Sequence, residues 1–100
     1  MDDNKIWIFP KSVNIEEVSE YVESLKNIKS RDVVTFDLSK TVNIHSSFIG
    51  FLIHAKHHIN KNGGRLVLLL SLTVEKILIM LNIIEYFSPE IETSFNKKTA

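Results

Sequence analysis

The sequence predicts an α/β domain in which helices pack on a mostly parallel, mixed sheet of about four strands. Short apolar blocks alternate along the chain with segments whose apolar residues recur every three or four positions, the helical period. The most apolar block, residues 65–70, is a continuous run of the kind found inside parallel sheets. Strands that alternate with helices are usually joined by crossover connections, so parallel pairing is expected.

The first half of the chain predicts a strand, a helix and a second strand. Residues 6–9 are a short apolar strand closed by Pro10, which has no N–H for a sheet ladder. Asn14 is a suitable N-cap for the following helix. The apolar stripe of this helix should face the core and comprises Ile15, Val18, Tyr21, Val22, Leu25 and Ile28. Residues 33–38 then mix valine, threonine and phenylalanine, as buried strands do.

A second helix is predicted to begin near Ser46 or Ser47. It should end at residues 62–64, Asn-Gly-Gly, where a glycine supplies the left-handed cap. The side chains expected to be buried on this helix are Phe48, Phe51 or Leu52, Ala55 and Ile59.

The last third of the chain predicts two strands and a helix. Residues 65–70 should form a strand that is covered on both faces. A helix opens at Thr73 and ends about Asn82, because asparagine tolerates the left-handed conformation. Residues 91–95 could form a last edge strand before the polar tail.

Length and composition indicate one domain spanning residues 1–100, with a core at about residues 6–87 and a polar tail at residues 96–100. The formal net charge is zero, so no general attraction to nucleic acid is expected and close protein–protein association is permitted. Without cysteine, disulfides and thiolate chemistry are excluded, and we expect a cytoplasmic protein. The longest apolar region, residues 66–84, contains too many polar side chains for direct membrane insertion.

No motif predicts an enzyme or a cofactor. The sequence contains no Gly-x-Ser-x-Gly nucleophile turn and no glycine-rich phosphate-binding loop. His54, His57 and His58 have spacing that could chelate a metal, but no residue elsewhere obviously completes a site. We therefore expect a protein that is not an enzyme and has neither metal nor cofactor.

Ser46 and Ser47 are the most informative residues, because they follow a strand and open a helix. One interpretation is helix capping, which is worth about 1 kcal/mol. The other is phosphorylation, since free amides and the helix dipole favour negative charge at a helix start. His45 is either a local structural residue or, when protonated, a partial counter-charge for a phosphate.

Two further surfaces could bind proteins. Spacings of three and four place Gly50, His54, His57 and Lys61 on one stripe with Ser47, which is either a solvated face or a partner contact. The third helix is apolar around most of its circumference. Ile79, Met80 and Ile84 are therefore candidates for an oligomer surface, including a homodimer; the alternative is that they close a thin core.

Several segments, taken together and in order, resemble the STAS domain of bacterial anti-sigma-factor antagonists. They are residues 36–39 (Phe-Asp-Leu-Ser), 45–50 (His-Ser-Ser-Phe-Ile-Gly), 62–68 (Asn-Gly-Gly-Arg-Leu-Val-Leu) and 78–87. In that family an Asp-Leu-Ser turn leads to Asp-Ser-Ser/Thr-Gly-Leu-Gly at the next helix start. A glycine turn, an apolar strand and a Leu-x-x-x-Gly-Leu-x-x-x-Phe helix exit follow.

The resemblance implies a STAS-like fold and a regulatory protein that binds an anti-sigma factor with serine kinase activity. It places the phosphorylated hydroxyl on Ser46, with Ser47 as the alternative. It also implies that the surrounding surface contacts the partner; the residues concerned are His45, Ser46, Ser47, Gly50, His54, His57 and Lys61.

The sequence departs from the family pattern at the helix start. His45 stands where the family usually has aspartate, and Phe48 stands where it has the first glycine. A second hypothesis therefore remains beside the switch: a STAS subunit that is not phosphorylated and acts as an adaptor. The larger complex would be a stress-signalling scaffold or a lipid-transport ATPase complex.

Overall fold

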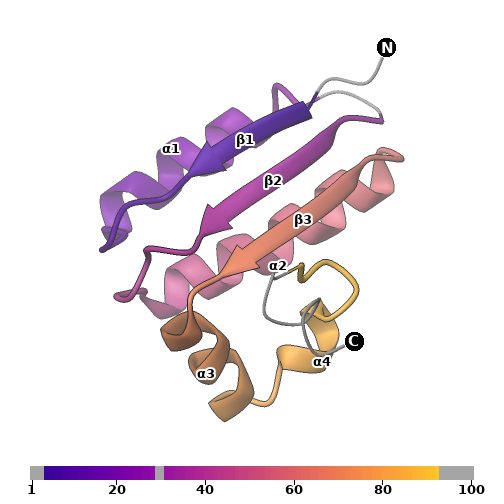
Figure 1. Cartoon of the computed structure of the whole chain (residues 1–100). Coiled ribbons are helices and arrows are strands. Elements are labelled where there is room, and N and C mark those ends of the chain that lie inside the picture. The colour runs from indigo at the N-terminus through magenta and orange to yellow at the C-terminus, as the bar shows by residue number, and fades with distance from the viewer. Residues whose placement is uncertain (1–3, 29–30, 93–100) are drawn as a thin grey trace.

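The computed structural model describes residues 4–28 and 31–92 and has an α/β architecture (Figure 1). Strands alternate with helices along the first seventy residues, as predicted, and two helices follow. The elements are β1 (Asn4–Ile8), α1 (Ile15–Leu25), β2 (Val33–Leu38), α2 (Ser46–Lys61), β3 (Arg65–Leu70), α3 (Leu72–Met80) and α4 (Ile84–Phe87).

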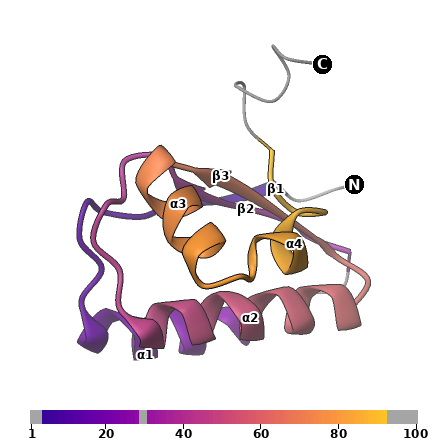
Figure 2. The ribbon, with the colours of Figure 1, turned by 90° about the horizontal axis from the view of Figure 1, so that it is seen from below.

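The strands form a parallel sheet in the order β1-β2-β3, with Ile6 beside Thr35 and Thr35 beside Val67. Figure 2 shows α1 and α2 together under one face of this sheet, with α3 and α4 beside the β3 edge. The opposite face carries neither long helix (Figure 2). Trp7 of β1 packs against the core, so the exposed side chains of its neighbours Ile6 and Ile8 alternate to this opposite face. The continuous apolar sequence of β3 is therefore not explained by helices packed on both faces of the sheet.

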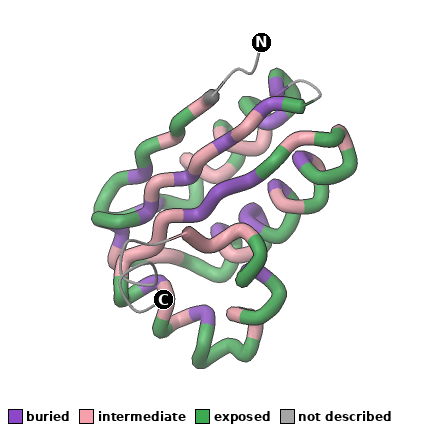
Figure 3. The backbone as a smooth tube through the Cα atoms, turned by 45° about the vertical axis from the view of Figure 1, so that its right-hand side comes forward, coloured by how far each residue is buried: buried purple, intermediate pink, exposed green. Residues whose placement is uncertain are grey.

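The core lies between the sheet and the two long helices, where the buried segments of Figure 3 face one another. Aromatic rings form its centre: Trp7 stacks on Phe36 with ring centroids 5.0 Å apart, and Phe9 meets Phe48 edge-on at 5.4 Å. On α2, every side chain expected in the core is buried; these are Phe48, Phe51, Leu52, Ala55 and Ile59. On α1, the prediction for Ile15 is wrong, because this side chain is exposed.

The ends of the later helices explain their lengths. Gly63 follows α2 with φ +79° and Asn82 follows α3 with φ +63°, so both residues adopt the left-handed conformation expected of them. The predicted start of α3 at Thr73 is one residue late, because α3 begins at Leu72. Ser71 caps the helix, and its Oγ accepts the Val74 N–H at 3.0 Å. No helix among the described residues has the length and hydrophobicity needed to cross a bilayer.

The sheet has three strands in the described part of the chain, fewer than the four expected. Of the strand predicted at residues 91–95, only residues 91 and 92 are described, and there Ile91 forms an isolated parallel bridge with Leu68. Leu68 donates to the Glu90 carbonyl at 2.7 Å and accepts from the Glu92 N–H at 2.8 Å. Residues 93–95 and the predicted tail at residues 96–100 lie outside the described residues.

Candidate functional site

Ser46 and Ser47 begin α2 at the carboxyl end of the parallel strands. The connection that precedes them is fixed by its neighbours. Thr41, which is fully buried, donates to the Pro10 carbonyl at 2.8 Å, and Ser71 Oγ donates to the Thr41 carbonyl at 2.6 Å. This edge is where open α/β sheets usually present their binding groups.

The two serine hydroxyls do not cap α2. The N-cap residue is His45, and no side-chain cap hydrogen bond forms at this helix start. The Phe48 and Ile49 N–H groups bond the His45 carbonyl at 2.9 and 3.2 Å, so the helical bonds begin after both serines. Ser46 and Ser47 are exposed, and within the described residues no hydrogen bond engages either hydroxyl. The capping interpretation is therefore wrong.

The stripe predicted from helical spacing is a continuous exposed face. Gly50, His54, His57 and Lys61 are all exposed, as are His45 and the two serines. At Gly50 an added Cβ would meet no atom within 4 Å, so the helix surface is open there. The structure thus brings the sequence-predicted contact residues together on one surface.

An apolar groove between α1 and the start of α2 borders this stripe. Its volume is about 530 Å³, and it is lined by Ile15, Val18, Ser19, Glu20, Val22, Glu23 and Ser47. Sequence reasoning missed the groove because it assigned Ile15 to the core; Val18 and Val22 do pack against the core, as predicted, but also line the groove. No sequence signal separates Ile15 from the buried stripe, since its helical spacing is the same as that of its neighbours.

The histidines of α2 lie close together without forming a metal site. The rings of His54 and His58 are 6.2 Å apart, and His58 Nε2 lies 3.3 Å from the Asn62 side-chain nitrogen. Across residues 4–28 and 31–92, no group of three or more histidine, aspartate and glutamate residues could hold a metal ion.

Asp37, at the end of β2, belongs to a local turn. Its Oδ1 accepts the Ser39 hydroxyl at 2.6 Å and the Ser39 N–H at 3.0 Å. These two hydrogen bonds stabilise the charged form and lower the pKa of Asp37 below its ordinary value. They fix the direction in which the chain leaves the sheet toward α2.

The candidate oligomer surface on α3 is only partly as expected. Ile79 and Met80 are exposed, and Met80 is 82% exposed, but Ile84 is half-buried and packs against the core. Leu72 and Leu81 are also exposed, which enlarges the apolar surface of this helix beyond the sequence prediction.

Comparisons with known proteins add no relative from which a role for this site could be inferred. No protein-family model matches the sequence, and no curated protein matches it.

Proposed function

We propose that this chain is a STAS-like cytoplasmic regulatory protein, an anti-sigma-factor antagonist that binds an anti-sigma factor with serine kinase activity. Phosphorylation of Ser46 switches the binding off. The observation that carries the proposal is the pair of exposed serines at the start of α2, whose hydroxyls are not used for capping. In this mechanism the domain supplies no catalysis, because the partner kinase performs the transfer.

The surroundings of the serines support a charge-controlled contact. Ser47 lines a groove together with Ile15, Val18 and Val22, so a partner bound there would cover apolar surface beside the hydroxyls. A phosphate adds roughly −1.5 to −2 charges at this rim. A partner that closes over it would have to remove its water, which is costly when no counter-charge is provided. Glu20 and Glu23 also line the groove, and their negative charges cannot compensate that of the phosphate.

The second candidate is an adaptor subunit that is never phosphorylated. One observation favours it: α3 exposes Leu72, Ile79 and Met80, and Leu81 directly after it is exposed as well, which is more apolar surface than a short surface helix requires. The complex would be a stress-signalling scaffold or a lipid-transport ATPase complex.

Affinity capture from the protein's own cells tests the proposal, with the wild type compared with Ser46→Ala and Ser46→Asp. If Ser46 is a switch, the wild type and Ser46→Ala should capture an ATP-binding serine kinase, and Ser46→Asp should fail to capture it. Phosphopeptide mapping of the wild type should locate phosphate on Ser46. Ser88→Asp is the matched control, because Ser88 is an exposed serine outside the stripe and the groove.

The adaptor predicts a different result. Transporter or scaffold subunits would be recovered equally with all variants, and Ser46 would carry no phosphate. Equal recovery of a kinase with Ser46→Ala and Ser46→Asp would also contradict the switch.

A further inference from the structure

β1 is an edge strand whose outer side is unpaired within the described residues. The Phe9 N–H donates to the Asp37 carbonyl at 3.0 Å, just beyond the end of β1. Because backbone groups alternate in direction along a parallel strand, those of Trp7 face β2 and those of Ile6 and Ile8 face outward. β1 pairs with β2 alone in the described sheet, so these outward groups are available to another strand.

Both sides of this edge carry apolar surface. On the open face of the sheet, Ile6 and Ile8 are 64% and 74% exposed. On the helix side, two pockets lie between β1 and α1 and share Trp7 and Ser24. One is also lined by Ile8, Phe9 and Tyr21, and the other by Lys5, Asn27 and Ile28. An added strand would therefore gain backbone hydrogen bonds and cover apolar groups on both faces.

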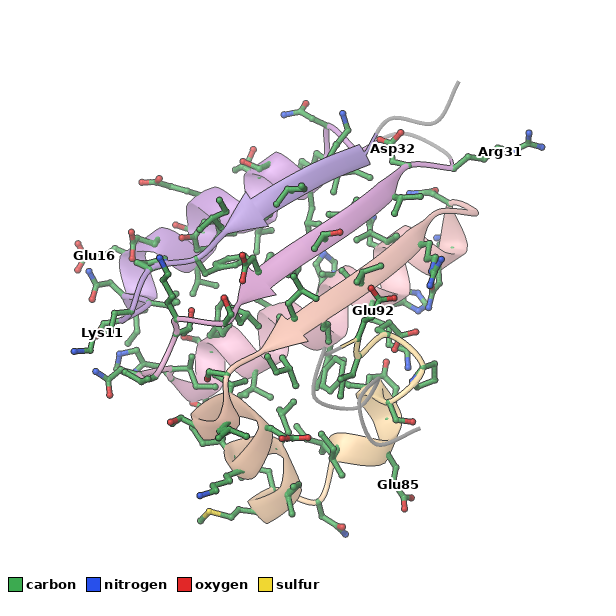
Figure 4. The ribbon with its side chains drawn as sticks, viewed as in Figure 1. Lys11, Glu16, Arg31, Asp32, Glu85 and Glu92 are labelled. Atoms are coloured by element: carbon green, nitrogen blue, oxygen red, sulfur yellow. The ribbon has the colours of Figure 1, made fainter. Side chains whose placement is uncertain are left out.

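The charges along β1 differ between its two ends. Lys5 lies at the amino end, 4.0 Å from Asp32, and Figure 4 shows Asp32 and Arg31 at that end of the sheet. Glu16 lies at the opposite end, together with Lys11 (Figure 4). Burial raises the pKa of the Tyr21 hydroxyl, and the nearby negative charges of Glu17 and Glu20 raise it further. The carboxyl end of the edge is therefore the more acidic one.

We infer that the chain forms a two-fold symmetric dimer in which β1 pairs antiparallel with β1 of a second copy. Two-fold pairing brings the amino end of each β1 beside the carboxyl end of the other, so Lys5 approaches the acidic end of the partner copy. The zero net charge of the chain adds no long-range repulsion between copies. The result is one continuous sheet through both subunits.

The side chains favour one register, with Ile6 opposite Ile6 of the second copy. All outward-facing residues of β1, Asn4, Ile6 and Ile8, then form hydrogen-bonded pairs. Lys5 faces Trp7 of the second copy, an arrangement suited to a cation–π contact. A shift toward the amino end would place Lys5 opposite Lys5, and like charges directly opposite are unfavourable.

A cross-linking experiment tests this register, because the sequence contains no cysteine. In the proposed dimer, Ile6→Cys places two thiols on a hydrogen-bonded pair with Cα atoms about 5.5 Å apart. This is within the disulfide range of about 4.4–6.8 Å. Ile8→Cys is the matched control: it is similarly exposed, but in this register its two copies lie four positions apart along the strands, about 14 Å at about 3.4 Å per residue.

Under mild oxidation we expect a covalent dimer with Ile6→Cys and at least about tenfold less with Ile8→Cys. Equal cross-linking of both variants would indicate random collision and overturn the proposal. Sedimentation of the unmodified protein should show a reversible monomer–dimer equilibrium, and a strictly monomeric wild type would overturn it as well.

Ile6→Pro provides the second measurement. Proline removes the outward N–H of residue 6 and leaves the N–H groups that bond β2 in place. We expect at least a tenfold larger dimer dissociation constant, with hydrogen exchange at β2 amides unchanged to confirm folding; Ile6→Val should behave like the wild type. Dimerisation that survives Ile6→Pro but is abolished by Met80→Lys would assign the dimer to α3 and overturn the β1 interface.

Discussion

Lys56 of α2 and Glu90 form an ion pair at 3.0 Å, and their side chains are only 14% and 9% exposed. The Lys56 ammonium also donates to the Tyr86 carbonyl and lies 3.9 Å from the centre of the Tyr86 ring. The ion pair joins Lys56 Nζ to Glu90 Oε1, so this ammonium is the positive charge that compensates the burial of the carboxylate. One lysine therefore holds α4 and the chain next to the Ile91 bridge against α2.

Removing this lysine should destabilise the fold more than removing both partners. Lys56→Met leaves a buried carboxylate uncompensated and should lower the free energy of unfolding by about 3 kcal/mol. The double variant Lys56→Met/Glu90→Gln should lose clearly less. Urea denaturation measures both, and Lys61→Met, an exposed lysine on the same helix, should change stability by less than about 0.5 kcal/mol. Equal losses in the single and double variants would show that the cost of Lys56→Met does not come from an uncompensated Glu90 carboxylate.

Serine-to-alanine changes should separate a switch residue from a cap. Ser46→Ala and Ser47→Ala remove hydroxyls that make no cap, so unfolding free energies should stay within about 0.5 kcal/mol of the wild type. Ser71→Ala should cost about 1 kcal/mol or more, because the Ser71 hydroxyl caps α3 and donates to Thr41. Thermal and urea denaturation provide the comparison. A loss at Ser46 as large as that at Ser71 would restore the capping interpretation.

Gly50 allows the partner surface to be tested without disturbing the fold. Gly50→Ala should stabilise α2 by about 0.5–1 kcal/mol, since alanine is the better helix former and the added Cβ meets no atom. Gly50→Trp should also fold, but its bulk in the stripe should abolish capture of the partner. Gly64→Ala is the opposite case, because its Cβ would lie 2.6 Å from the Asp32 carbonyl oxygen and should destabilise the protein. Undiminished capture with Gly50→Trp would remove this stripe from the contact surface.

The sequence could predict features that depend on local chemistry. The buried face of α2 follows from the spacing of Phe48, Leu52 and Ile59, which only one side of a helix can satisfy. The turns at Gly63 and Asn82 follow from the few residue types that tolerate positive φ. The position of Ser46 and Ser47 at the start of a helix could also be predicted, because a strand pattern ends before them and a helical apolar period begins after them.

Features that depend on distant contacts could not be predicted. Ser71 and Thr73 are both acceptable caps, and Ser71 is fixed by a hydrogen bond to Thr41, thirty positions earlier in the chain. Ile15 has the spacing of a core residue, but it is the first residue of α1 and lines the groove between α1 and the start of α2. The single bridge at Ile91 likewise depends on where Lys56 holds the chain after α4.

The turn at the end of β2 should make stability depend on pH. Hydrogen bonds from Ser39 lower the pKa of Asp37, so their stabilisation is present above the ordinary aspartate pKa of about 3.9 and is lost as the pH falls through the lowered folded value. Ser39→Ala should therefore cost about 0.5–1 kcal/mol at pH 7 and progressively less in acid. It should also return the pKa of Asp37 toward its ordinary value, which NMR titration of the carboxyl carbon measures directly. Ser39→Thr retains the hydroxyl and should preserve the low pKa. Ser39→Ala keeps the backbone N–H bond to Asp37, so an unchanged Asp37 titration would show that the Ser39 hydroxyl does not stabilise the charge at the point where the chain turns toward Ser46.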